Sequence, residues 1–228
     1  MPAGALRDAD AAMYRAKEQG RSRWVVFAPE MRSVVVHREE TERALRSAID
    51  KGELRLHYQP IVRLGYDEIV GAEALLRWEM PERGLVPPGE FVPLAEETGL
   101  IVPVGAWVMG EATRRLAEWR DAGVLCPGFV MTVNLSLRQL DDPRLVENVA
   151  AVLEASGIEA SSLCLELTES ALAADGESAV RVLRDLRTLG GGPRDRRLRH
   201  RLLGAESPEA VPLRHLEDRP LFHRRPGA

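Results

Sequence analysis

Three polar side chains stand near the ends of apolar segments: Glu73 in VGAEALLRW, Asn134 in MTVNLS and Glu166 in LCLELTE. Burying a carboxylate or an amide without a partner costs several kcal/mol, so a polar residue in such a segment is expected to have a bonding partner or a function. Two carboxylates and an amide oxygen form a hard-oxygen set that suits Mg²⁺ or Mn²⁺ and suits zinc poorly. Each residue alone also fits a capped or hydrogen-bonded strand end, and it is their joint occurrence that favours a cation site.

Two more side chains could contact an anionic substrate. Arg77 lies four residues after Glu73, hence on the same face of the expected strand, and its guanidinium could bind a phosphate through two hydrogen bonds. A surface salt bridge is the alternative for Arg77. Gln59 ends the preceding apolar segment, in HYQP. His57 is interpreted as a structural partner, because no second His or Cys stands at metal-ligand spacing.

Strand and helix patterns alternate through the middle of the chain. The apolar spacing predicts a helix from Glu39 to about Asp50, then strands at 53–59 and 68–78, helices at 90–98 and 104–122, a strand at 129–135, a helix at 143–155, a strand at 163–168 and a helix at 177–189. This order indicates a parallel sheet covered by helices, either an open doubly wound sheet or an incomplete (β/α)₈ barrel. Glu73, Asn134 and Glu166 would then point into one mouth of the sheet.

The overall composition excludes several classes of protein. The 228 residues carry a net charge of −4, which argues against a footprint for nucleic acid or an anionic membrane. No apolar run approaches the ~18 residues of a membrane span. Cys126 and Cys164 have no CxxC or metal-type neighbour, and they are interpreted as buried reduced thiols of a cytoplasmic protein.

The two ends of the chain differ from its middle. A helix pattern at 7–19 and a strand pattern at 24–27 are too little for a domain and indicate the last part of one. Residues 190–228 hold nine Arg and no Lys and carry a net charge of +4, against −8 for residues 1–189. This basic tail lacks interleaved aromatic residues and any nucleic-acid-binding motif, so nucleic-acid binding is not expected.

Five ordered segments carry a resemblance to a known family. LRLHYQPIVRL, GAEALLRW, PGEFVPLAEETGLI, VNLS and LELTES together resemble the EAL domain of bacterial cyclic di-GMP phosphodiesterases, over residues 41–189. The N-terminal RDADAAMYRAKEQGRSRWVVF resembles the end of a GGDEF domain, although the signature loop of that domain is absent. The resemblance implies residues 1–30 as a GGDEF remnant, 31–40 as a linker and 41–189 as the first part of the EAL domain.

The EAL resemblance also implies a chemistry. The expected fold is a modified (β/α)₈ barrel in which two divalent ions, Mg²⁺ or Mn²⁺, activate a water that hydrolyses cyclic di-GMP to pGpG. By that resemblance, Glu73, Asn134 and Glu166 match metal ligands, and Gln59 and Arg77 match substrate contacts.

The family pattern stops after the helix at 177–189. The expected Asp-Asp-Phe-Gly and Leu-Lys-Ile-Asp segments are absent, yet RRLRHRLLGAE can be encoded so that a one-base shift reads Asp-Asp-Phe-Gly-Thr-Gly-Tyr-Ser-Ala-Leu. The segment HLEDRPLFHRRPG similarly yields the lysine motif in the shifted frame. The two aspartates would fall at Arg196 and Arg197 and the lysine at Glu217, which indicates a frameshift near 190–192.

No complete catalytic set is therefore expected, and the chain as written is predicted to lack phosphodiesterase turnover. Residues 190–228 are expected to be an out-of-frame, disordered tail. Two alternatives stay open: a degenerate module that still binds cyclic di-GMP, and a pseudogene product without a stable fold. An unpaired edge strand in a partial barrel could also pair with a second copy as a homodimer.

Overall fold

The computed structural model describes residues 9, 12, 13, 24–63, 65, 66, 68–167, 177–189 and 199–202. Its helices are α2 (Pro29–Ala48), α3 (Pro88–Thr98), α4 (Ile101–Asp121), α5 (Leu137–Leu140), α6 (Leu145–Ser156) and α8 (Glu177–Thr188). Its strands are β1 (Leu54–Arg63), β2 (Glu68–Met80), β3 (Gly84–Val86), β4 (Val130–Leu135), β5 (Leu163–Leu167) and β6 (Arg199–Leu202).

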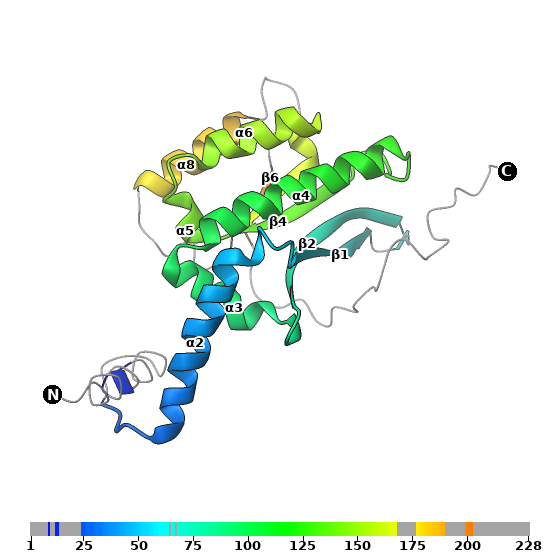
Figure 1. The fold of residues 1–228 in the computed structure, drawn as a ribbon. Coiled ribbons are helices and arrows are strands. Elements are labelled where there is room, and N and C mark those ends of the chain that lie inside the picture. The colour runs from blue at the N-terminus through cyan, green and yellow to red at the C-terminus, as the bar shows by residue number, and fades with distance from the viewer. Residues whose placement is uncertain are drawn as a thin grey trace.

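The strands form one mixed sheet in the order β1-β2-β4-β5-β6, with β3 paired to β2 outside this path. β1 and β2 are antiparallel, whereas β2, β4, β5 and β6 are parallel neighbours. Helices α4, α6 and α8 lie together along one side of the strands (Figure 1). Within the described residues β1 and β6 do not pair with each other, so the sheet is open and the barrel is not closed.

The two faces of the sheet differ in polarity. Met131, Val133 and Leu135 of β4 alternate into the core and are at most 1% exposed, while Asn134 between them is exposed. On β2, Trp78 is fully buried and stacks edge-to-face on Phe91 of α3 at 5.4 Å. The helices therefore cover the apolar face, and the intervening positions of the strands form the opposite face.

The long helix α4 is amphipathic. Its buried residues recur at spacings of three and four along one face, from Ile101 through Val104, Val108 and Ala112 to Leu116. This spacing is the pattern of an amphipathic helix packed on a core. The preceding helix α3 ends at Gly99, whose φ of 77° permits the left-handed turn that leads into α4.

Several sequence-based boundaries are wrong. Residues 24–27 form no strand, and Trp24 is 85% exposed. The helix expected to begin at Glu39 begins ten residues earlier, at Pro29, and so includes residues 31–40. The short strand β3, which pairs with the end of β2, is not among the strands that the pattern predicts.

The ends of the chain are described only in part. Of the helix expected at 7–19, residues 9, 12 and 13 are described and are helical, and the rest lies outside the described residues. Within the tail, residues 199–202 form β6, and the other residues of the tail lie outside the described ones. Cys164 is buried and Cys126 is half-buried, both as thiols. None of the described helices is long and apolar enough to cross a membrane.

Candidate functional site

The sequence-predicted acid and amide meet on the sheet. The Asn134 side-chain amide donates a hydrogen bond to Glu73 Oε1 at 2.8 Å, across the β2–β4 junction. Glu73 lies in the middle of β2, not at its end as expected, but the parallel ladder with β4 extends from Gly71 only to Ala74. Glu73 thus stands where the parallel pairing of β2 ends, close to the carboxyl end of β4.

Glu166 lies on the same face as Asn134. The two residues are direct partners in the parallel ladder of β4 and β5, and partners in such a ladder project from the same face. Glu166 is 4% exposed, so its carboxylate is buried while Asn134 is exposed. The structure therefore brings all three predicted metal ligands to one face of the sheet, near the carboxyl ends of the parallel strands.

The predicted substrate contacts also share this face. Gln59 is the antiparallel partner of Glu73, and Arg77 follows Glu73 by four residues along β2. The Arg77 guanidinium donates to the carbonyl of Leu76 at 2.8 Å, and among the described residues it forms no ion pair. The surface salt bridge considered for Arg77 is thus not present within the described residues. His57 is on the same face and is exposed.

The tail strand β6 pairs with β5, the strand that carries the buried acid. The register of β5 and β6 pairs Glu166 with Arg201 and Cys164 with Arg199. Arg196 and Arg197, which stand where the shifted frame reads the two aspartates, lie outside the described residues. Within the described residues, the register position next to Glu166 is therefore occupied by Arg201.

The donor set fits a divalent cation only in part. Glu73, Asn134 and Glu166 are hard oxygen donors of the kind that Mg²⁺ and Mn²⁺ prefer. In the described part of the chain, however, no three His, Cys, Asp or Glu side chains gather into a group that could hold a metal. Within the described residues, Glu73, Asn134 and Glu166 therefore do not form a complete cation site.

A contact that the sequence analysis missed lies beside Asn134. The Ser136 hydroxyl donates to Glu96 Oε1 of α3 at 2.6 Å. Ser136 caps α5 and forms a reciprocal capping box with Gln139. The sequence shows a capping-box spacing at Ser136 and Gln139, but it contains no local signal for a partner 40 residues away.

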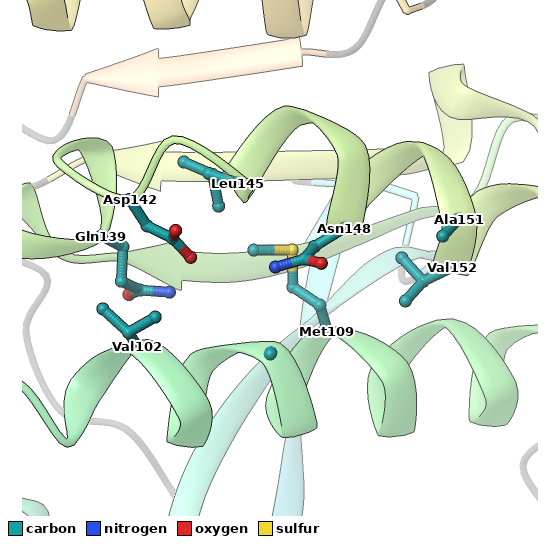
Figure 2. A pocket seen from close by; sticks show the side chains of 9 residues that line it. Val102, Met109, Gln139, Asp142, Leu145, Asn148, Ala151 and Val152 are labelled. Atoms are coloured by element: carbon teal, nitrogen blue, oxygen red, sulfur yellow. The ribbon is translucent and has the colours of Figure 1, made fainter.

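The cavities lie away from this face. A cavity of about 160 Å³ lies in the helix layer. Figure 2 shows Met109 of α4 and Asn148 of α6 among the side chains that line it. A second, more open hollow of about 340 Å³ lies farther along the same two helices. Neither is lined by Glu73, Asn134, Glu166, Gln59 or Arg77, so the helix-layer cavities are distinct from the candidate site.

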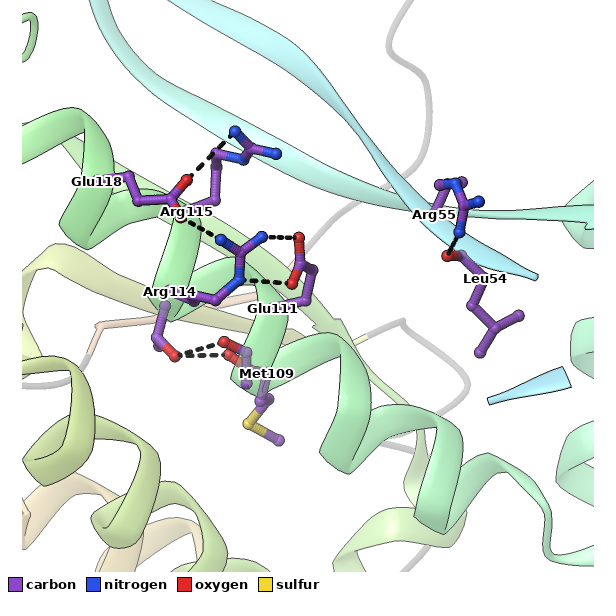
Figure 3. Close-up of polar contacts among 9 residues, drawn as sticks. Leu54, Arg55, Met109, Glu111, Arg114, Arg115 and Glu118 are labelled. Atoms are coloured by element: carbon purple, nitrogen blue, oxygen red, sulfur yellow. Dashed lines mark hydrogen bonds and ion pairs between the residues drawn. The ribbon is translucent and has the colours of Figure 1, made fainter. Parts of the chain in front are cut away.

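The helix-covered side carries a network of charges on α4. Arg114 donates two hydrogen bonds to the Glu111 carboxylate, at 2.6 and 2.9 Å, and also binds Glu118 (Figure 3). Arg115 forms an ion pair with Glu118 at 3.2 Å. Burial raises the pKa of the neighbouring Tyr58 phenol to about 12, with the charge of Glu111 adding to the effect. This network lies on the side of β1 opposite to Gln59.

Comparisons with known proteins agree with this architecture. The EAL domain profile matches residues 42–192. The chain is 42% identical to the cyclic di-GMP phosphodiesterase PdeR of Escherichia coli and to the bifunctional diguanylate cyclase/cyclic di-GMP phosphodiesterase MucR of Pseudomonas aeruginosa, each over 185 residues. These matches cover 81% of the chain but only 27% of each relative.

Solved structures give the same result. The PaMucR phosphodiesterase in its c-di-GMP complex superposes with a TM-score of 0.62 at 42% identity, over 67% of this chain and 61% of that one. The EAL enzyme Bd1971, in a form with cAMP and cyclic di-GMP bound, superposes with a TM-score of 0.64 at 29% identity, over 82% and 48% of the two chains. Since the profile match extends over more than half of the sequence, the chain belongs to the EAL domain family.

Proposed function

We propose that this EAL domain belongs to a cyclic di-GMP signalling protein and that, with its present sequence, it does not hydrolyse cyclic di-GMP. The observation that carries the proposal is the register of β6, which puts Arg201 opposite the buried Glu166. An arginine keeps its positive charge at any accessible pH, and it cannot act as a ligand of a cation. The EAL profile match also ends at residue 192, before this strand begins.

The chemical reason is the shortage of ligands. Glu73, Asn134 and Glu166 are the residues that would hold a divalent cation, which would supply activation of a water and stabilisation of the phosphoryl oxygens. The two cations of the family scheme would need more acidic ligands than these three residues provide. Residues 196–206 and 215–227 can be encoded so that a one-base shift reads the missing aspartates and lysine, and we therefore attribute the loss to a frameshift near 190–192.

A phosphodiesterase assay tests the proposal by comparing the chain with a variant whose tail is translated in the shifted frame. We expect no conversion of cyclic di-GMP to pGpG above the level of Glu73→Ala when the purified chain is incubated with Mg²⁺ or Mn²⁺ and the products are separated by chromatography. A variant in which the tail from residue 190 is re-encoded in the shifted frame is the positive control, and it should produce pGpG. Turnover by the unrepaired chain above the Glu73→Ala control would refute the proposal.

Retained binding of cyclic di-GMP is a second candidate function. It is favoured by the position of Gln59 and Arg77, which share a face of the sheet with Glu73 and which sequence resemblance assigns to substrate contact. Solved relatives such as PaMucR contain c-di-GMP. A guanidinium that has no ion pair among the described residues has donors available for a phosphate.

Calorimetry with cyclic di-GMP tests the binding candidate. Arg77→Ala should weaken binding by about tenfold, the cost of one charge-assisted hydrogen bond to phosphate. Arg63→Ala is the matched control, because Arg63 lies at the far end of β1 and pairs with Glu68. Equal affinities for the two variants, or no heat at all from the unmutated chain, would eliminate this function.

A further inference from the structure

Helix α3 connects the two strands that carry the candidate site. Phe91 near its start is fully buried against Trp78 of β2, with the rings edge-to-face at 5.4 Å. Glu96 near its end accepts a hydrogen bond from Ser136, the residue directly after β4. The same helix is therefore attached to β2, which carries Glu73, and to the end of β4, which carries Asn134.

Ser136 uses all of its polar groups. Its hydroxyl donates to Glu96 Oε1 at 2.6 Å and accepts from the backbone N–H of Arg138 at 3.3 Å. Its own backbone N–H donates to the side chain of Gln139 at 3.0 Å. The last two bonds are local and form the cap of α5, so the bond to Glu96 is the one that ties this turn to a distant element.

We propose that Glu96 is a positioning residue of the candidate site. By holding Ser136, the Glu96 carboxylate fixes the end of β4 relative to β2, and so maintains the 2.8 Å contact between Asn134 and Glu73. Glu96 does not itself reach Glu73 or Asn134 through any hydrogen bond within the described residues. The inference deepens the proposed function and rests on it only where cyclic di-GMP is the probe.

The neighbouring glutamate provides an internal comparison. Glu97 is 55% exposed and forms an ion pair with Arg38 of α2, on the other side of α3. Glu96 and Glu97 thus share the same helix, charge and helix propensity, but only Glu96 contacts Ser136. A change in the site that follows loss of Glu96 and not of Glu97 cannot come from the charge or the helicity of α3.

The test measures amide hydrogen exchange of residues 134–139 and, separately, the affinity for cyclic di-GMP. Glu96→Ala should speed this exchange and weaken cyclic di-GMP binding, each by about tenfold, the value of one hydrogen bond to a charged acceptor. Glu96→Gln should retain both values, because the amide oxygen still accepts the Ser136 proton. Glu97→Ala should match the unmutated chain.

A second variant covers the case in which Glu96→Ala does not fold. Ser136→Asp retains the capping acceptor for α5 but has no proton to donate to Glu96, so it should show the same faster exchange with α5 still formed. Exchange at 134–139 that is equal in Glu96→Ala, Glu97→Ala and the unmutated chain overturns the positioning role. If the unmutated chain binds no cyclic di-GMP, the binding function fails alone, because the exchange measurement needs no ligand.

Discussion

The phenol of Tyr58 lies on the helix-covered face of β1, next to the guanidinium and carboxylate groups of α4. Its ring packs edge-to-face against Trp119 at 4.9 Å. Burial is the main reason that its pKa is raised from 10 to about 12; the charge of Glu111 acts in the same direction, and Arg115 and Arg114 act against it. The folded protein therefore holds this proton more tightly than the unfolded chain does.

The pH dependence follows from the direction of this shift. A group with a raised pKa in the folded state stabilises the fold fully below its unfolded value, near pH 10, and this contribution is lost as the pH rises toward 12. A difference of about 2 pKa units corresponds to at most about 2.7 kcal/mol in the free energy of unfolding. Urea unfolding at pH 9, 10 and 11 should show that the free energy of unfolding falls less steeply with pH in Tyr58→Phe than in the unmutated chain. An equal fall in the two proteins would contradict the raised pKa of Tyr58.

At the scale of elements, α4 contains two glycines in opposite surroundings. A Cβ at Gly105 would come within 1.9 Å of the side-chain nitrogen of Gln139, so the glycine lets α5 approach α4 closely. That glutamine is 4% exposed and completes the capping box with Ser136. A Cβ at Gly110 would meet nothing within 4 Å.

The two glycines should therefore respond in opposite ways to alanine. Gly105→Ala should lower the free energy of unfolding by about 1–3 kcal/mol, because Gln139 must leave its capping position or the helices must separate. Gly110→Ala should raise it by about 0.5–1 kcal/mol, because alanine is the better helix former and the space is open. Denaturant unfolding of both variants measures these free energies. A Gly105→Ala variant that is more stable than the unmutated chain would show that α5 does not pack against α4 as described.

At the scale of the whole molecule, the sheet has edges at β1 and β6. Within the described residues each of these strands pairs on one side only. β1 is ten residues long and carries the exposed Val62, whereas β6 has four residues. A long edge strand with an exposed apolar side chain is a template for pairing with another chain, so association of two copies is expected through β1.

Sedimentation tests the association. The chain should shift from monomer to dimer with rising concentration, and Val62→Lys should move this shift to higher concentration, because an edge lysine opposes strand pairing. Val36→Lys on α2 is the control, since Val36 is similarly exposed and is remote from the sheet edge. A single monomeric species at all concentrations with a cooperative thermal transition would exclude both this association and the alternative of a chain without a stable fold.

Much of the fold could be predicted from local patterns. The alternation of apolar residues in LCLELT and the spacing of three and four in α4 depend on neighbours along the chain, and the expected strands and helices in these regions are confirmed. The boundaries failed where tertiary contacts decide them. β3 forms because the end of β2 offers it a partner, and α2 extends across a segment that lacks an apolar pattern of its own.

The residue types of the site could likewise be predicted from the sequence. A carboxylate or an amide within an apolar strand stands out, because burying it without a partner costs free energy. Alone, the sequence determined the set of Gln59, Glu73, Arg77, Asn134 and Glu166 and the face that each takes within its own strand. The tertiary structure decided which of them meet. Register between strands is set by packing across elements far apart in the chain, and it pairs Asn134 with Glu166 and Glu166 with Arg201. The packing of α3 against the sheet brings Glu96 to Ser136.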